Sequence, residues 1–368
     1  MATVDDKPPL SPDGTPALDD DGAAESSADA EAHAQLVRGT AALDLGADKG
    51  GGGRGRRRTR AAADEGGGAA PPPEAGGRQL YAFGWNGAGQ LGTGDTMNQK
   101  IACAVGPLAD KRVAIVACGG PYTVLATDTE EVWGFGANAR GQLGLGHVMD
   151  QLQPCRLDPP KPLLSWKVEL IACGYAHTVF LTDDLSVFSC GANSWGQLGL
   201  GDTDDRNHPC KVERLSKVAV RQLDCGAAHT MVVCDGARSD GSLAPPPIDE
   251  VDAPSEGDEG PDEEPDEPGP LGPGVYGFGR NKEGQLGLGP RSTTPALNDQ
   301  IQRKPVLVET LAGHMAEEES ALELRCGGYH TAVVVGRRKR LLTFGQNCYG
   351  QLGLGDQEDR FEPDEVDL

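Results

Sequence analysis

Aromatic residues and long apolar runs are both scarce in this chain. Phe, Trp and Tyr make up only 5% of its 368 residues, beside 53 Gly and 27 Pro, a composition that indicates repeats and low-complexity segments. No apolar run approaches the roughly 20 residues that a membrane helix needs, so we expect no membrane partner. Acidic residues such as Asp5 and Asp19 argue against a secretory signal and against an acid-poor transit peptide. We therefore expect residence in the cytoplasm, with the nucleus as the alternative.

Positive charge is scarce as well, and the excess of acid is concentrated in three segments. The chain holds 33 Lys and Arg against 56 Asp and Glu, a net charge of −23. Residues 1–77 carry a net −6, residues 235–274 a net −12 and residues 356–368 a net −6, which leaves about +1 for the rest of the chain. Such segments are typical of solvated, disordered chain. The charge disfavours nucleic acid as a main partner.

These segments set the predicted domain boundaries. Residues 1–77 are predicted to be a disordered low-complexity tail, and residues 78–368 a repeat domain. Within that domain, residues 235–274 are predicted to be a disordered acidic, Pro-rich insertion and residues 357–368 an acidic tail. The first tail contains a basic run at residues 54–60, which is either a nuclear address or nucleic-acid contact or, as we favour, a common feature of disordered tails.

What the chain does have is internal repetition. The word Gly-Gln-Leu-Gly-Leu-Gly occurs at Gly141–Gly146 and returns at Gly196–Gly201, Gly284–Gly289 and Gly350–Gly355, and with one change at Gly89–Gly94. An Asn stands three residues before each copy and follows a short apolar run that ends in Gly. These five residues are Asn86, Asn138, Asn193, Asn281 and Asn347. The pattern predicts a unit of strand, turn and glycine-rich loop.

A second word, Cys-Gly-x-x-His-Thr, completes the repeat. It contains His177, His229 and His330, and Tyr122 holds the place of the His in a weaker copy. Successive repeat Asn positions lie 138 − 86 = 52, 193 − 138 = 55, 281 − 193 = 88 and 347 − 281 = 66 residues apart, so the last two intervals contain insertions. A period of about fifty, filled with short apolar runs punctuated by Gly and Pro, predicts an all-β fold of four-stranded blades around an axis, a β-propeller.

The paired words resemble the repeat of the regulator of chromosome condensation family. The resemblance covers about residues 78 to 356 in five copies, of which four are complete and one is half. It implies a propeller that is usually seven-bladed, whereas this chain supplies about five repeat units. We expect a small closed ring, an open ring completed by a second copy or a partner, or an incomplete sequence. An open ring exposes an edge strand and an apolar blade face, and it predicts self-association or marginal stability.

Structural roles account for most of the repeated residues. Gly takes positive φ freely and allows close backbone approach, so we assign backbone roles to Gly141, Gly196, Gly284 and Gly350. A phosphate cradle would need Gly-x-Gly-x-x-Gly opening a helix, which these loops lack. Equivalent histidines are expected to lie far apart in the ring and to bond locally to backbone. With no Ser-His-Asp or Cys-His pairing, we predict no catalytic residue and no cofactor.

The cysteines also follow the repeat. Cys103, Cys155 and Cys210 each stand 17 residues after their repeat's Asn, and four others precede the Gly of the second word. Neither set has the spacing of zinc ligands. We therefore expect small buried residues and no metal.

Two variable residues stand between each Asn and the first Gly of the loop word. In a propeller these pairs lie on one rim, where Trp and Arg are residue types that anchor protein interfaces. The alternative is that Trp195 and Tyr349 pack on the neighbouring blade's loop. The candidate partner-binding residues on this rim are Arg140, Trp195, Lys282, Glu283 and Tyr349.

These observations favour a non-enzymatic interaction scaffold or regulatory propeller that binds a protein partner through its loop rim. The resemblance implies, as an alternative, a guanine-nucleotide exchange factor for a small Ran-like GTPase. That activity needs a projecting wedge, and no hairpin insertion is visible in the early repeats. Chromatin association through the basic run is a weaker alternative. The family's ultraviolet photoreceptors use tryptophans beside the His-Thr word, and this activity is not implied here, where the matching residues are Gly120, Tyr175, Ala227 and Gly328.

Overall fold

The structure is a computed structural model that describes residues 80–159, 167–216, 218–235, 271–289, 300–311, 323–336 and 339–368. The strands in these ranges form one two-stranded and four four-stranded antiparallel sheets. Each sheet is one blade, and we number the blades 1 to 5 in chain order. The predicted all-β propeller of about five repeat units is confirmed. The predicted tail, residues 1–77, and most of the predicted insertion lie outside the described residues.

The blades have the following strands. Blade 1 holds β1 (Tyr81–Gly84) and β2 (Gln99–Ala104). Blade 2 holds β3 (Val113–Cys118), β4 (Tyr122–Thr127), β5 (Val132–Gly136) and β6 (Gln151–Leu157). Blade 3 holds β7 (Val168–Cys173), β8 (His177–Thr182), β9 (Val187–Gly191) and β10 (Arg206–Lys211). Blade 4 holds β11 (Val220–Cys225), β12 (His229–Cys234), β13 (Gly274–Arg280) and β14 (Ile301–Leu307). Blade 5 holds β15 (Glu323–Cys326), β16 (His330–Val335), β17 (Arg340–Gly345) and β18 (Arg360–Glu365).

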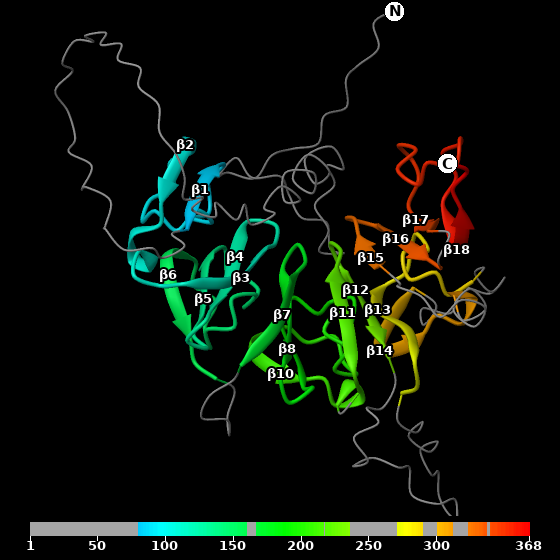
Figure 1. The fold of residues 1–368 in the computed structure, drawn as a ribbon, viewed down its shortest axis with the longest axis horizontal. Coiled ribbons are helices and arrows are strands. Elements are labelled where there is room, and N and C mark those ends of the chain that lie inside the picture. The colour runs from blue at the N-terminus through cyan, green and yellow to red at the C-terminus, as the bar shows by residue number, and fades with distance from the viewer. Residues whose placement is uncertain are drawn as a thin grey trace, which may run out of the picture.

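The blades follow an open arc. The first strands of blades 2 to 5 contact one another in sequence, β3 with β7, β7 with β11 and β11 with β15, so they line the inside of the arc. The last strand of each blade is the outer edge. Figure 1 shows blade 1 and blade 5 on the two sides of a gap, and the sheets do not close into a ring. Of the three predicted arrangements, the small closed ring is therefore wrong.

The outer strands of blades 2 to 5 share one feature, a proline within the strand. The four residues are Pro154, Pro209, Pro305 and Pro363. Each outer strand also has a register shift where it pairs with the third strand of its blade. Proline lacks the N–H donor of a sheet ladder and is tolerated at such an edge, where it also hinders pairing with another chain.

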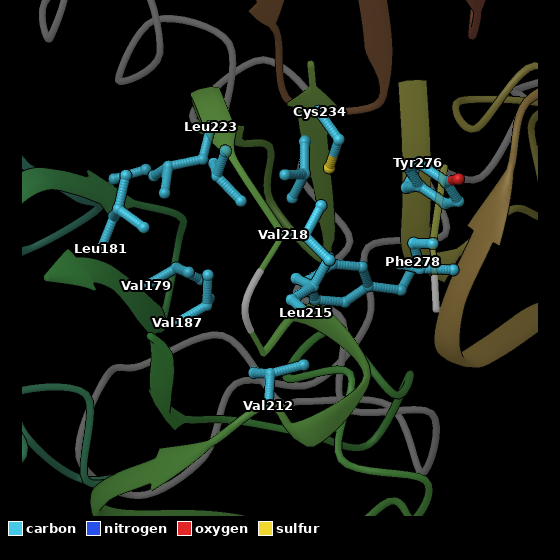
Figure 2. Close-up of a cluster of buried hydrophobic side chains, with 14 of the residues drawn as sticks. Val179, Leu181, Val187, Val212, Leu215, Val218, Leu223, Cys234, Tyr276 and Phe278 are labelled. Atoms are coloured by element: carbon cyan, nitrogen blue, oxygen red, sulfur yellow. The ribbon is translucent and has the colours of Figure 1, made fainter. Parts of the chain in front are cut away.

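The hydrophobic core lies between neighbouring blades. Figure 2 shows Val179 and Val187 of blade 3 facing Leu223 and Phe278 of blade 4 in one buried cluster. Phe278 is fully buried, and burial of such a side chain contributes about 1.5–3 kcal/mol. The stability of each blade therefore depends on the next blade along the arc.

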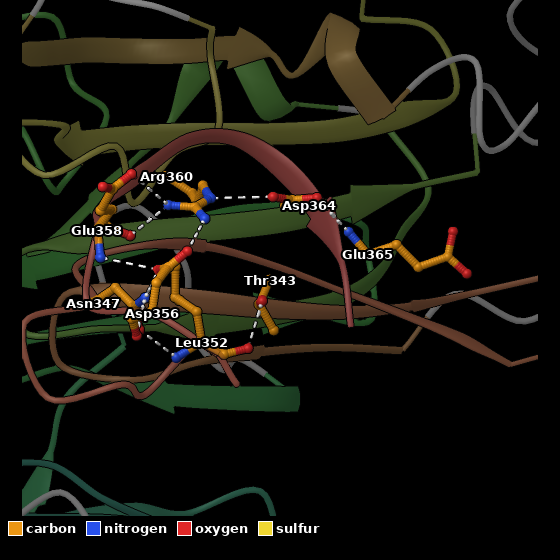
Figure 3. Close-up of polar contacts among 8 residues, drawn as sticks. All are labelled: Thr343, Asn347, Leu352, Asp356, Glu358, Arg360, Asp364 and Glu365. Carbon is orange, nitrogen blue, oxygen red and sulfur yellow. Dashed lines mark hydrogen bonds and ion pairs between the residues drawn. The ribbon is translucent and has the colours of Figure 1, made fainter. Parts of the chain in front are cut away.

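Residues 357–368 are not the plain acidic tail that their composition predicts. Arg360–Glu365 form β18, whose Asp364 lies opposite Thr343 of β17. Arg360 anchors this strand, because its Nε lies 3.1 Å from Asp364 Oδ2 and its Nη2 lies 2.5 Å from Asp356 Oδ2 (Figure 3). Charged side chains suit this strand because it is the outer edge of its blade.

The predicted insertion, residues 235–274, also needs a correction at its end. Leu271 is only 9% exposed and belongs to the core cluster between blades 3 and 4. The carbonyl of Gly272 accepts a hydrogen bond of 3.0 Å from the Tyr276 hydroxyl. The folded blade therefore includes Leu271–Gly274. None of the helices within the described ranges is long and apolar enough to cross a membrane.

Candidate functional site

The Asn of each repeat is buried and holds the loop that follows it. In all five repeats, the Oδ1 accepts a hydrogen bond of 2.9–3.0 Å from the amide of the Leu five residues later. In the four repeats whose loop the structure describes in full, the Nδ2 donates to the carbonyl nine residues later, at 2.8–3.1 Å. The side chain of one buried Asn thus bonds to the backbone at two points of the loop. The two variable residues lie on the outer side of this loop.

The acidic residue nine positions after the Asn strengthens this loop within its own blade. Asp356 Oδ1 accepts from Asn347 Nδ2 at 3.0 Å and from the Glu358 amide at 3.0 Å (Figure 3). The Glu358 amide, followed by the Arg360 guanidinium, holds the pKa of the Asp356 carboxyl below its usual value. Asp202 makes the matching contact in blade 3, where Arg206 Nη2 lies 2.5 Å from its Oδ2.

The Gln of each loop word connects the loop to the next blade. Its side-chain oxygen accepts from the amide of the second variable residue, at 2.9–3.0 Å in all five copies. Its backbone carbonyl accepts from the Thr hydroxyl of the second word in the following blade. The four described bonds of this kind, 2.7–2.9 Å long, are Thr123–Gln90, Thr178–Gln142, Thr230–Gln197 and Thr331–Gln285. The two sequence words are therefore the two sides of one blade-to-blade contact.

Two features of this blade-to-blade contact require Gly at the first position of the loop word, namely its backbone conformation and the lack of space beside it. Gly141 has φ +80°, and a Cβ there would lie 2.4 Å from Asn207 Cα in the outer strand of the next blade. Gly284 has φ +84°, and a Cβ there would lie 2.4 Å from the Arg360 carbonyl oxygen. L-residues rarely adopt such a φ, and neither position has room for a side chain.

Two of the histidines connect blades, contrary to the prediction that they bond locally to backbone. His177 Nε2 lies 3.0 Å from Thr230 Oγ1, and His229 Nε2 lies 3.2 Å from Thr331 Oγ1, each in the following blade. The prediction was wrong because the inner strands converge on the inside of the arc. Burial lowers the pKa of both histidines to about 3, so they are neutral at physiological pH. They hold the blades together and offer no exposed acid or base.

Arg280 contacts side chains of both neighbouring blades on the loop rim. It ends β13 and is only 8% exposed. Its guanidinium carbon lies 4.6 Å from the ring centroid of Trp195 in blade 3 and 5.0 Å from that of Tyr329 in blade 5. Its Nε and Nη2 donate to the two carboxylate oxygens of Glu283, at 2.9 and 2.5 Å. A cation held by two aromatic rings and a bidentate carboxylate joins three blades.

The structure brings two of the five predicted rim residues together. Trp195 and Glu283 both contact Arg280, so Trp195, which is half-buried, packs on the neighbouring blade as the alternative states. Lys282, beside Glu283, is exposed. Arg140 lies on the loop of blade 2 and pairs with Asp205 of blade 3 at 3.1 Å.

Tyr349 differs from the other residues of the predicted rim. It occupies the place of Trp195 in blade 5, where the described chain has no following blade. It is 54% exposed, whereas Trp195 is half-buried.

Arg280 and Tyr329 were not among the predicted site residues. A signal for Arg280 was present in the sequence: the residue before the repeat Asn is Trp, Ala, Ala and Gln in the other four copies, and Arg only here. Nothing in the local pattern pointed to Tyr329, which lies 49 residues after Arg280 (329 − 280).

The rim offers no metal site in the ranges that the structure describes. No group of three or more His, Cys, Asp or Glu side chains is arranged to hold an ion there. None of the ten cysteines forms a disulfide. Burial raises the pKa of Cys173 to about 12, so this thiol stays protonated.

Family models match most of the chain. The regulator of chromosome condensation (RCC1) repeat matches residues 79–126, 130–181, 186–233, 274–334 and 340–368, and a second model of this repeat matches residues 168–197. The chain belongs to this family. A match such as residues 130–181 runs from β5 to β8, so one sequence repeat contains the outer half of one blade and the inner half of the next.

Relatives and solved structures agree with this assignment. The chain is 29% identical over 285 residues to the ultraviolet-B receptor UVR8 of Arabidopsis thaliana, covering 77% of this chain and 53% of the relative. It is 31% identical over 279 residues to the X-linked retinitis pigmentosa GTPase regulator of Mus musculus, covering 65% and 24%. The chain thus spans about half of the first relative and about a quarter of the second.

Two solved structures share the propeller. Human WBSCR16 aligns with a TM-score of 0.58 at 25% identity, over 78% of this chain and 62% of that chain. Prp20p from Saccharomyces cerevisiae aligns with a TM-score of 0.56 at 17% identity, over 79% and 59%. The second likeness shows the fold alone.

Proposed function

We propose that this protein is an interaction scaffold that binds a protein partner on its loop rim around Arg280. The observation that carries this proposal is the Trp195–Arg280–Tyr329 stack with its Glu283 clamp. Arg, Trp and Tyr are the residue types most enriched at binding hot spots. These side chains are already held in place, so binding requires little further ordering of them.

The surroundings of the stack suggest the chemistry of the partner. Lys282 projects next to Glu283 and is exposed, and Arg140 on another loop is also exposed although paired with Asp205. Tyr175, in the turn between β7 and β8 on this rim, is 49% exposed. A partner with a small apolar patch flanked by carboxylates fits this arrangement. The family supports a regulatory, protein-binding role in the same general sense.

The test is affinity capture with the full chain followed by quantitative mass spectrometry. A true rim partner is recovered with the wild type and is lost with Trp195→Ala and with Lys282→Glu. The matched control is Lys167→Glu, which reverses an exposed charge just before β7, at the opposite end of that strand from the rim turn. Partners that all three variants retain equally would overturn the proposal.

Guanine-nucleotide exchange on a small Ran-like GTPase is the second candidate. It is favoured by the structural likeness to Prp20p, which was described together with its binding to Gsp1p and histones. At 17% identity this likeness shows a shared fold, so exchange activity rests on the family resemblance. Chromatin association through residues 54–60 is a third candidate, and this run lies outside the described residues.

A further inference from the structure

A pocket of about 240 Å³ opens between the loop that follows Asn138 in blade 2 and the start of the outer strand of blade 3. Ala139, Arg140 and Val148 line it from blade 2, and residues 205–208 line it from blade 3. Binding sites for small molecules usually measure about 300–1,000 Å³, so this pocket is smaller than a typical cofactor site. Its size suits a single side chain of a partner.

Bonds between the two blades hold the walls of this pocket in place. Arg140 Nη1 lies 3.1 Å from Asp205 Oδ2. Asn207 Nδ2 donates to the Gly146 carbonyl at 3.1 Å, and the Gly146 amide donates to the Asn207 carbonyl at 2.7 Å. His208 Nδ1 lies 3.1 Å from Asn207 Oδ1. The walls are therefore fixed before any ligand binds, and binding requires little further ordering of them.

The two arginines that line the pocket already have carboxylate partners. Arg140 pairs with Asp205, and Arg206 Nη2 lies 2.5 Å from Asp202 Oδ2. An anionic ligand beside Arg140 would meet the negative charge of Asp205 as well as the positive charge of the guanidinium, and the two effects oppose each other. The charges of the pocket therefore do not favour a carboxylate or a phosphate.

A guanidinium and apolar groups remain accessible in this pocket. The side chain of Arg140 is 44% exposed although it is paired, Val148 is 54% exposed, and Ala139 is exposed as well. An aromatic ring binds this combination, because the face of the ring attracts the cation and its carbon skeleton covers apolar surface. In the part of the chain that the structure describes, no Trp, Tyr or Phe lines the pocket.

The surroundings of Arg280 show the same arrangement with its ring in place. Arg280 pairs with the carboxylate of Glu283, and the ring centroid of Trp195 lies 4.6 Å from its guanidinium carbon. Arg140 has the carboxylate, from Asp205, but none of the residues that line its pocket supplies the ring. A partner can supply it.

We propose that this pocket binds one aromatic side chain, Trp, Tyr or Phe, of a peptide segment in a partner protein. The ring stacks on the guanidinium of Arg140 and contacts the methyl groups of Val148. Met149, the next residue in the chain, is 64% exposed and offers apolar surface to an aliphatic residue beside the aromatic one. The site adds an aromatic anchor to the rim chemistry proposed above, and it shares no residue with the Arg280 stack.

A library of random peptides displayed on phage and selected on the full chain tests the proposal. Phage that also bind the Arg140→Gln variant are removed, so that the peptides retained depend on the Arg140 guanidinium. These peptides are expected to share a Trp, Tyr or Phe at one fixed position. They are then synthesised and measured by fluorescence anisotropy, and replacing the shared aromatic residue by Ala is expected to weaken binding at least about tenfold, as for an interface anchor.

Two further variants locate the binding site of the retained peptides. Val148→Glu is expected to weaken their binding, because its carboxylate competes for Arg140 at the pocket. Arg112→Gln is the matched control, since Arg112 is also an exposed Arg paired with a carboxylate, that of Asp128 at 3.3 Å, and it lies just before β3. This variant is expected to bind the peptides like the wild type. Melting curves verify that all variants are folded.

Three results would overturn the proposal. The first is a selection that yields no peptide dependent on Arg140. The second is a set of peptides that share Asp or Glu in place of the aromatic residue, which is the result expected for an anion site. The third is a Val148→Glu variant that binds the peptides like the wild type. Because a short peptide reports on this pocket alone, the test can fail while capture of a rim partner through Trp195 succeeds, and the reverse.

Discussion

The guanidinium carbon of Arg280 lies 4.6 Å from the ring centroid of Trp195, and the two residues belong to consecutive blades. The pair is largely removed from water, because Arg280 is only 8% exposed. A cation–aromatic contact of this kind therefore contributes both to the rim surface and to the cohesion between blades 3 and 4.

Trp195→Ala is expected to lower the free energy of unfolding by about 1–2 kcal/mol, the range of a partly desolvated cation–aromatic contact. Tyr349→Ala is the matched control, because Tyr349 occupies the equivalent position in blade 5 and is 54% exposed. Its effect is expected to stay within about 0.5 kcal/mol, as for ordinary surface positions. Urea denaturation at low protein concentration measures both. Equal effects of the two substitutions would contradict the stacking role of Trp195.

The buried histidines predict an acid-sensitive fold. His177 and His229 have a pKa of about 3 in the folded protein against 6.5 as the ordinary value. Between these values the unfolded chain binds more protons than the folded one, so stability falls as the pH falls through 6.5. At a pH one unit below the ordinary pKa, each histidine is expected to lower the free energy of unfolding by about 1 kcal/mol relative to its value at neutral pH.

A series of urea denaturations between neutral and mildly acidic pH checks this expectation. His177→Gln is expected to lower stability at neutral pH and to reduce the slope of stability against pH. An unchanged slope in this variant would show that other groups cause the acid sensitivity.

The connection between β12 and β13 contains a long segment that is predicted to be disordered, residues 236–270, and a short folded end that includes Leu271. Cys234 lies opposite Gly274 in the ladder, so the two strands need only a short turn. Replacing residues 236–270 by a short Gly-Ser linker is expected to change the free energy of unfolding by less than about 1 kcal/mol, because loop closure depends weakly on length. Extending the deletion to residue 273 removes the buried Leu271 and is expected to lower the free energy of unfolding by about 2 kcal/mol or more. A large loss from the shorter replacement would contradict the predicted disorder of the insertion.

Exchange activity is expected to be absent. The described strands in residues 80–159 and 167–216 all belong to blades, so no hairpin there is available as a wedge. The net charge outside the three acidic segments is only about +1, which predicts no basic face for an acidic GTPase surface. Release of a fluorescent GDP from a Ran-like GTPase is the measurement. A stimulation of about tenfold, equivalent to about 1.4 kcal/mol in the barrier, would make exchange the leading function.

Much of the fold was predictable because the sequence words act over short distances. Asn193 bonds the amide of Leu198, five residues later, and the Gln197 side chain bonds the amide of Trp195. Such local bonds repeat wherever the word repeats, so the word alone indicates a strand followed by a fixed loop. Strand β18 was missed because it lies at the outer edge of its blade, where many of its residues are charged, Asp364 among them. These residues do not show the alternation of apolar and polar side chains that indicates a strand.

The sequence by itself determined the blade, its period and the approximate number of blades, because hydrogen bonds between near neighbours specify them. Only the tertiary structure decided that His177 reaches Thr230 in the next blade and that Arg280 lies between rings from two other blades. It also decided that blade 1 and blade 5 do not meet. These features depend on the angle between successive blades, which results from side chains packing across their shared cores and is not contained in any single repeat.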